Sequence, residues 1–216
     1  MEWNEVQGRI WCCELCRGHE RVACDIRQRT EPPSRSVTLM LIGVAPPHVK
    51  DITTKTVANS ATNDEDDNLR KRFVEVTLGR SWANLLERGL FLVHGVKCAI
   101  VPRDRHQEPP DDVVNVCAPR HLADELALTR PPRIVAFGGA PHRALAKVPG
   151  ITLPKDLGMS KRVRELAAKT KGGVDIQARG WTSSLHVSPF PLNGKKPNPV
   201  AVEVLREAAR LAGLIP

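Results

Sequence analysis

The chain has 216 residues and a formal net charge of +8, and 41% of its residues are hydrophobic. A chain of this size and apolar content can fold as one sizeable α/β domain. It has no apolar run of the ~20 residues that a transmembrane helix needs, and the acidic residues 1–5 are not followed by the apolar core of a signal peptide. We therefore expect a cytoplasmic protein without membrane contacts. Its basic charge favours a polyanionic partner, nucleic acid first, although a basic protein with no such partner stays an alternative.

Residues 1–30 form a basic, helical-looking segment that carries a C-x-x-C pair, Cys13 and Cys16. Disulfides are rare inside cells, so paired cysteines there favour metal or redox chemistry. One turn of chain with this spacing brings both sulfurs to one metal. Cys12 and Cys24 are left over, and Cys12 could replace Cys13 only with a poorer spacing.

A continuous apolar run over residues 37–42 predicts a central parallel strand that is buried on both faces. It ends in the turn Gly43-Val44-Ala45-Pro46-Pro47. Ligands bind beyond the carboxyl ends of strands in open α/β sheets, so this turn is a candidate site element, although a plain strand-to-loop break explains it equally simply. Residues 48–72 lack periodicity, as functional loops often do, and residues 69–89 predict a helix that Gly89 closes.

A second apolar run, residues 90–93, predicts another buried strand that leads into Cys98. After a proline- and charge-rich loop, Asp111 and Asp112 follow prolines and predict a helix start, because carboxylates there meet free backbone N–H groups. We thus expect Cys98 to end a strand and Cys117 to lie in the first turns of a helix.

The two cysteines of this region and the C-x-x-C pair predict a four-cysteine metal or cluster site. Its predicted ligands are Cys13, Cys16, Cys98 and Cys117. Their spacing does not separate zinc from a [4Fe-4S] cluster, and ordinary buried thiols are the alternative.

The remaining chain alternates strand and helix patterns, which predicts a doubly wound, mostly parallel sheet of four strands. The predicted elements are a helix to residue 130, a strand over 133–137, a short helix over 140–148, one helix with loops over 149–180, a strand over 181–185 and an amphipathic helix over 199–214.

Four short motifs, in order along nearly the whole chain, resemble those of the uracil-DNA glycosylase superfamily, and within it the iron–sulfur branch of families four and five. The first is the C-x-x-C followed by the strand and turn from Gly43 to Pro47. The others are the run Val96-Lys97-Cys98 with its proline-rich loop and Cys117, the run Arg130-Pro131-Pro132-Arg133-Ile134-Val135-Ala136-Phe137-Gly138, and His186-Val187-Ser188.

The resemblance implies an α/β fold of three layers, α/β/α, around the mostly parallel four-stranded sheet. It also implies a [4Fe-4S] cluster on the four cysteines and hydrolysis of the N-glycosidic bond of uracil in DNA, which leaves an abasic site. The partner would be single- or double-stranded DNA. The chain would be a monomeric, nucleoid-associated glycosylase domain over residues 1–216, with a cluster-ligand segment over 1–30 and an α/β core over 37–216.

The resemblance places the turn Gly43-Val44-Ala45-Pro46 beside a flipped base, where the turn positions the hydrolytic water. Val44 stands where family four has an acidic residue, so the turn is nearer to the family-five form. The nearest candidates for a water-activating base are His48 and Asp51.

His94 stands where family members commonly use an asparagine to bind the uracil edge. An imidazole does not present both amide-type hydrogen bonds at once, so we expect a base range that includes other damaged bases. Phe73 is the candidate aromatic that stacks on the base. His186 would donate a hydrogen bond to uracil O2 as charge builds there, an effect of about 3–4 kcal/mol for a preorganised donor.

The segment from Ser188 through Phe190, Leu192 and Asn193 corresponds to the family's minor-groove wedge. Phe190 or Leu192 would fill the space that the flipped base leaves, and Ser188 would hold a phosphate. Core packing of Phe190 and a purely structural His186 are the alternatives. Basic residues near 155–171 and 195–196 would contact phosphates.

Two rival functions follow from the same residues. A non-catalytic iron–sulfur protein that binds nucleic acid would explain Val44 and His94 as marks of lost chemistry. A zinc-stabilised α/β protein that acts on some other ligand would explain the cysteines without a cluster.

Overall fold

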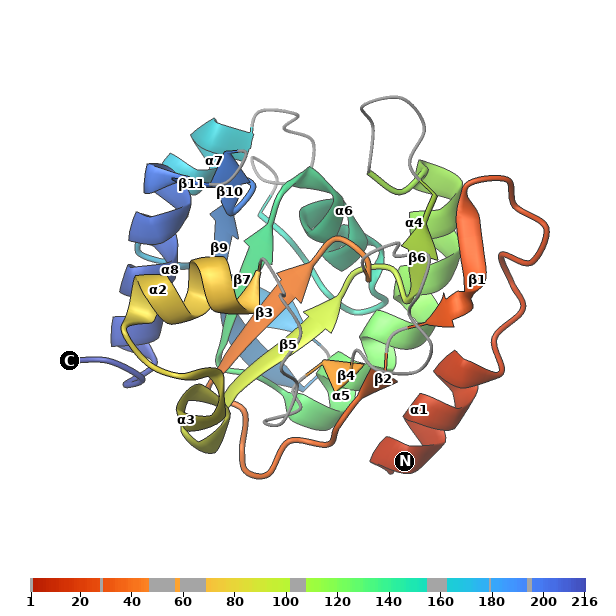
Figure 1. The fold of residues 1–216 in the computed structure, drawn as a ribbon, viewed down its shortest axis with the longest axis horizontal. Helices are drawn as coiled ribbons and strands as arrows, with labels where there is room; N and C mark the ends of the chain where they lie inside the picture. The colour runs from red at the N-terminus through yellow and green to blue at the C-terminus, as the bar shows by residue number, and fades with distance from the viewer. Residues whose placement is uncertain are drawn as a thin grey trace.

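The computed structural model describes residues 2–27, 29–46, 57–58, 69–101, 108–154, 163–178, 180–193 and 196–216. A five-stranded sheet in the order β5-β3-β7-β9-β8 forms its centre (Figure 1). The first four strands are parallel, and β8 is antiparallel to β9. The strands are β3 (Leu39–Gly43), β5 (Leu90–His94), β7 (Arg133–Phe137), β8 (Val174–Ala178) and β9 (Trp181–Ser188).

The expected mostly parallel α/β sheet is confirmed, but its predicted count of four strands is wrong by one. The missing strand, β8, has only Ile176 buried among its five residues. An edge strand of this kind lacks the continuous apolar run that marks a buried strand. It is held by antiparallel pairing with β9, across a turn in which Gly180 has a φ of +81°.

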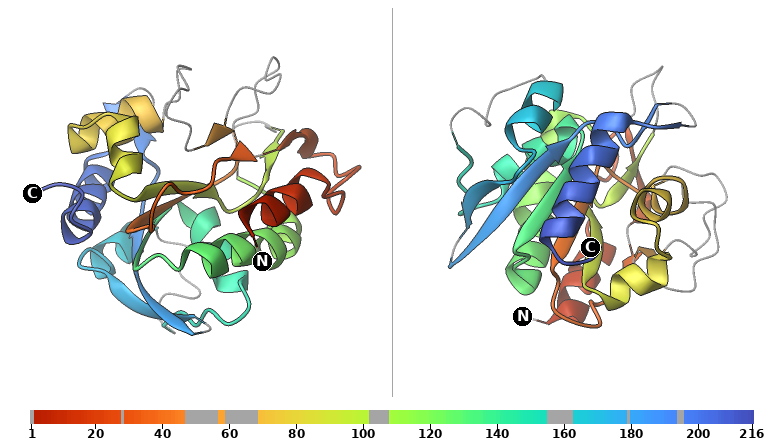
Figure 2. Two further views of the ribbon diagram at one scale, coloured as in Figure 1. Left: turned by 90° about the horizontal axis from the view of Figure 1, so that it is seen from below. Right: turned by 90° about the vertical axis from the view of Figure 1, so that its left-hand side faces the viewer.

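Helices cover both faces of the sheet, which gives the three-layer α/β/α arrangement (Figure 2). Neighbouring residues of β3 point to opposite layers: Met40 and Ile42 lie in one core, Leu39 and Leu41 in the other. One layer holds α4 (Asp111–Cys117), η2 (Ala118–Leu122), α5 (Ala123–Thr129) and α6 (Gly139–Lys147). The other holds η1 (Arg70–Glu75), α2 (Val76–Leu78), α3 (Trp82–Glu87) and α8 (Pro199–Leu211), with α7 (Val163–Lys169) between β9 and α8.

The N-terminal segment is only partly helical. Its helix α1 (Trp3–Trp11) packs beside α5 and is followed by a turn and by β1 (Val22–Arg27). Strand β1 pairs antiparallel with β6 (Cys98–Ile100), so Cys98 begins a strand instead of ending one. Two short pairs complete the described strands: β2 (Arg29–Thr30) with β4 (Val57–Ala58), and β10 (Leu192–Asn193) with β11 (Lys196–Pro197).

One predicted helix differs from the structure, and another agrees with it. The helix expected over 69–89 is split into η1, α2 and α3, because the chain turns at Gly79 with a φ of +64° and Ser81 caps the next helix. The helix that begins at Asp111, as predicted, continues from α4 through η2 to α5. Cys117 is the last residue of α4 and the seventh of this continuous helical segment, so it lies in the first turns, as expected.

Candidate functional site

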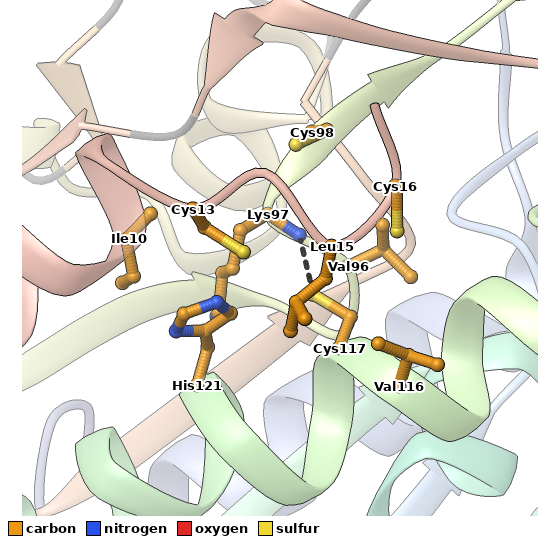
Figure 3. A pocket seen from close by; sticks show the side chains of 10 residues that line it. All are labelled: Ile10, Cys13, Leu15, Cys16, Val96, Lys97, Cys98, Val116, Cys117 and His121. Atoms are coloured by element: carbon orange, nitrogen blue, oxygen red, sulfur yellow. Dashed lines mark hydrogen bonds between the residues drawn. The ribbon is translucent and has the colours of Figure 1, made fainter. Parts of the chain in front are cut away.

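The four predicted metal ligands line one pocket (Figure 3). Cys13 and Cys16 come from the turn after α1, Cys98 from the start of β6 and Cys117 from the end of α4. The remaining lining side chains are mostly apolar, with one lysine and one histidine: Ile10, Leu15, Val96, Lys97, Val116 and His121. Segments far apart in the sequence thus bring four thiols to a single apolar site.

Burial and mutual repulsion oppose ionisation of these thiols. Burial raises the pKa of Cys117 to about 12, and it also raises the pKa of Cys98 and of Cys16. Negative charge on neighbouring cysteines raises each of these pKa values further, which places the sulfurs within electrostatic reach of one another. Thiolate ligands in such a site need a cationic group to stabilise them.

A fifth cysteine, Cys24, lies at the same site. Its charge contributes to the raised pKa of both Cys16 and Cys98, and its side chain hydrogen-bonds to Cys98. Cys24 reaches this place because β1 pairs with β6: it follows Ala23, the partner of Ala99, and so lies beside Cys98. No chelating spacing in the sequence marks Cys24, because strand pairing alone brings it to this site.

The residue types in this pocket match a ligand set of four thiolates, which structural zinc and a [4Fe-4S] cluster share. As the described side chains lie, no group of three or more His, Cys, Asp or Glu could hold a metal ion. When bound, such a cluster would supply cross-links between the N-terminal segment and the core.

Lys97 ties this pocket to the edge of the sheet. It is 1% exposed, and its Nζ donates to Glu125 Oε2 and to the carbonyl oxygen of His94. Its backbone N–H donates to Cys117 Sγ at 3.3 Å. A buried lysine pairs in this way because an uncompensated charge in the interior is very costly.

His121 is a pocket residue that sequence reasoning missed. It lies four residues after Cys117, on the same face of a helical segment. Burial, assisted by the charge of Lys97, lowers the pKa of His121 to about 4, so the ring is neutral at pH 7. The i, i+4 spacing of Cys117 and His121 is the signal that could have identified it.

At the carboxyl edge of the sheet, the structure brings two predicted base-binding residues together. Gly43 and His94 are partners in the parallel register of β3 and β5. A Cβ atom on Gly43 would lie 2.9 Å from His94 Cδ2, so only glycine leaves room for the ring. The turn is fixed by Gly95 N–H, which donates to Gly43 O at 2.9 Å, and by Val96 N–H, which donates to Val44 O at 3.1 Å.

The other residues of the predicted base pocket lie as follows. Val44 and Ala45 are half-buried, Ala45 against the core, and Pro46 is buried. Phe73 is fully buried and packs edge-on against Phe137, with ring centroids 5.6 Å apart, which is a core position. His48 and Asp51, the predicted base candidates, lie outside the described residues.

His186 is fully buried, two residues before the end of β9. Its Nδ1 lies 3.2 Å from the carbonyl oxygen of Lys171, and a Cβ atom on Gly173 would lie 3.1 Å from the ring. Burial lowers the pKa of His186, so the ring is neutral. A carbonyl oxygen only accepts, so Nδ1 carries the proton in this contact and Nε2 is left as an acceptor. Strand β7 separates His186 from the Gly43 edge.

The predicted wedge segment has one exposed apolar side chain. Phe190 is 46% exposed, and its ring covers Gly138, whose added Cβ would lie 3.3 Å from it. Ser188 is buried, and its hydroxyl donates to the carbonyl oxygen of Pro189. Leu192 packs against the core, and Asn193 pairs through its backbone with Lys196. Phe190 is therefore the better placed of the two wedge candidates.

No family model matches the chain, and no curated protein matches it. The likeness to glycosylases therefore rests on the sequence motifs alone. Within the described parts of the chain, no helix has both the length and the apolar character that crossing a membrane requires.

Proposed function

We propose that this chain is a monofunctional DNA glycosylase that hydrolyses the N-glycosidic bond of uracil, and of related damaged bases, with a [4Fe-4S] cluster as its cofactor. The observation that carries the proposal is the cysteine pocket. The four cysteines that the glycosylase motifs single out come from three separate segments, and they line one apolar pocket. This gathering supports a common metal centre over ordinary buried thiols.

Base recognition would take place at the carboxyl edge of the sheet, where parallel α/β sheets bind ligands. The Gly43 backbone and the His94 ring would contact the base, because the glycine lets the imidazole lie directly against the turn. A base reaches this edge only after it leaves the base stack. Unstacking costs a few kcal/mol, and the cost is lowest in single-stranded DNA. Phe190, half-exposed over Gly138, is the side chain suited to fill the gap.

Glycosidic cleavage builds negative charge on the departing base. A donor aimed at that charge in a dry site is worth about 3–4 kcal/mol. His186 would serve as this donor after its Nδ1–H leaves the Lys171 carbonyl when DNA binds, because its neutral ring in the present contact offers only an acceptor at Nε2. The net charge of +8 supports binding to phosphates, with an affinity that falls as salt rises.

A second candidate is a non-catalytic iron–sulfur protein that binds nucleic acid. The fully buried His186, held against a backbone carbonyl, favours it, since this geometry suits a structural histidine. Val44, at a place where family four supplies a carboxylate, agrees with that view.

The test uses a labelled single-stranded oligonucleotide with one uracil, incubated with anaerobically purified protein and then treated with alkali. The proposal predicts cleavage at the uracil, and a loss of about 100-fold or more in His186→Ala. The matched control is His142→Ala, a buried histidine on α6 that no step of the mechanism uses. Salt-sensitive DNA binding without any cleavage would contradict the enzyme and support the second candidate, a non-catalytic protein that binds nucleic acid.

A further inference from the structure

The imidazole ring of His121 is buried beside mostly apolar side chains. It is 1% exposed, and its ring lines the cysteine pocket (Figure 3). Neither Nδ1 nor Nε2 has a hydrogen-bond partner among the described residues. Each unmet buried group costs about 1–3 kcal/mol, so a ring with two of them calls for a partner outside the described side chains.

The pocket lining indicates what that partner is. Besides His121, the polar side chains that line it are four thiols and Lys97, and Lys97 donates its backbone N–H to Cys117 Sγ at 3.3 Å. The ammonium group of Lys97 is engaged by Glu125 and by a backbone carbonyl. Once thiolates and a metal group carry net negative charge there, their sulfur atoms accept hydrogen bonds, and such charge-assisted bonds are about twice as strong as neutral ones.

We propose that His121 donates an N–H to a sulfur atom of the metal centre that the four cysteines hold, and thereby raises its reduction potential. Reduction adds one electron and breaks no bond, so the reduced centre is the more negative one and gains more from the donor. Hydrogen bonds to sulfur are among the factors that set the potentials of iron–sulfur clusters. His121 is thus a positioning residue. This inference rests on the cofactor of the proposed function and not on uracil removal.

The experiment compares the parent with His121→Leu, which removes the N–H at similar volume, and His121→Gln, which restores one. Each protein is purified anaerobically, assayed for iron and titrated with dithionite while the visible absorbance is followed. We expect His121→Leu to keep its iron and to shift to a more negative potential, by about tenfold in the oxidised-to-reduced ratio (~59 mV for one electron). His121→Gln should return towards the parent.

His142→Leu is the control, because His142 is equally buried with an unpartnered Nε2 but lies outside the pocket. Its potential should equal the parent's. An unchanged potential in iron-loaded His121→Leu overturns the proposal, and so does loss of iron in the leucine and glutamine variants alike, which would make His121 a ligand. If His121→Leu does not fold, His121→Met removes the donor instead.

Failures of the two proposals are distinguishable. A parent that contains zinc or no metal overturns both the cofactor and the role of His121. A parent that contains iron and shows the expected potentials, but leaves uracil in DNA, overturns the glycosylase while it supports the inference about His121.

Discussion

The buried pair of Lys97 and Glu125 gives the sharpest prediction about stability. Both side chains are almost fully inaccessible, at 2% and 0% exposure. Lys97→Met removes one charge and leaves the Glu125 carboxylate in the interior without its partner. Breaking a buried pair from one side costs about 3–5 kcal/mol. For a chain of this length that corresponds to a fall in melting temperature of about 6–20 °C.

The double variant Lys97→Met with Glu125→Leu tests whether the loss of stability comes from the carboxylate that the single variant leaves without Lys97. Replacing both charges by apolar groups is often neutral, so most of the loss should be recovered. The carbonyl of His94 also loses its bond from Lys97, which leaves a residual cost of about 1–3 kcal/mol. The double variant should therefore be more stable than Lys97→Met alone.

Thermal unfolding followed by circular dichroism, under anaerobic conditions, measures all three proteins. Lys171→Met is the control, because its ion pair with Glu203 is exposed and should contribute less than about 1 kcal/mol. The reasoning is refuted if Lys97→Met melts within about 2 °C of the parent, or if the double variant is no more stable than Lys97→Met.

Three further outcomes are expected. Cys98→Ser should lose iron and visible absorbance, whereas Cys12→Ser, at an exposed cysteine outside the pocket, should keep both. Gly43→Ala should push the His94 ring aside and lower uracil excision at least tenfold with a folding cost of about 1–3 kcal/mol, and unchanged excision would remove this edge from the site. Burial lowers the pKa of His142 below 6.5, so its contribution to stability is complete above that pH and is lost as pH falls. Melting temperatures at about pH 7.5 and about pH 5.5 should therefore differ less in His142→Leu than in the parent.

Much of the framework was predictable from local sequence. Three apolar runs correspond to the parallel strands β3, β5 and β7, because a strand buried on both faces is apolar at nearly every position. The strand expected over 181–185 is the first part of β9, which continues to Ser188. The helix start at Asp111 follows from two prolines and two carboxylates. The C-x-x-C pair and two later cysteines indicated a common site, and the four do line one pocket.

Other features depend on contacts between distant segments. Strand β8 exists because β9 pairs with it, and Cys24 joins the cysteines because the pairing of β1 with β6 brings it beside Cys98. The sequence placed His186 near a strand end, but only packing turned its Nδ1 to the Lys171 carbonyl.

The sequence by itself therefore determined the class of fold, the order of its strands along the chain and the identity of the four thiols, since these depend on residue type and short-range periodicity. Tertiary structure decided which side chains meet: His94 against Gly43, Lys97 with Glu125, and His121 in the cysteine pocket. These contacts arise from strand register and helix packing, which join residues that no local pattern connects.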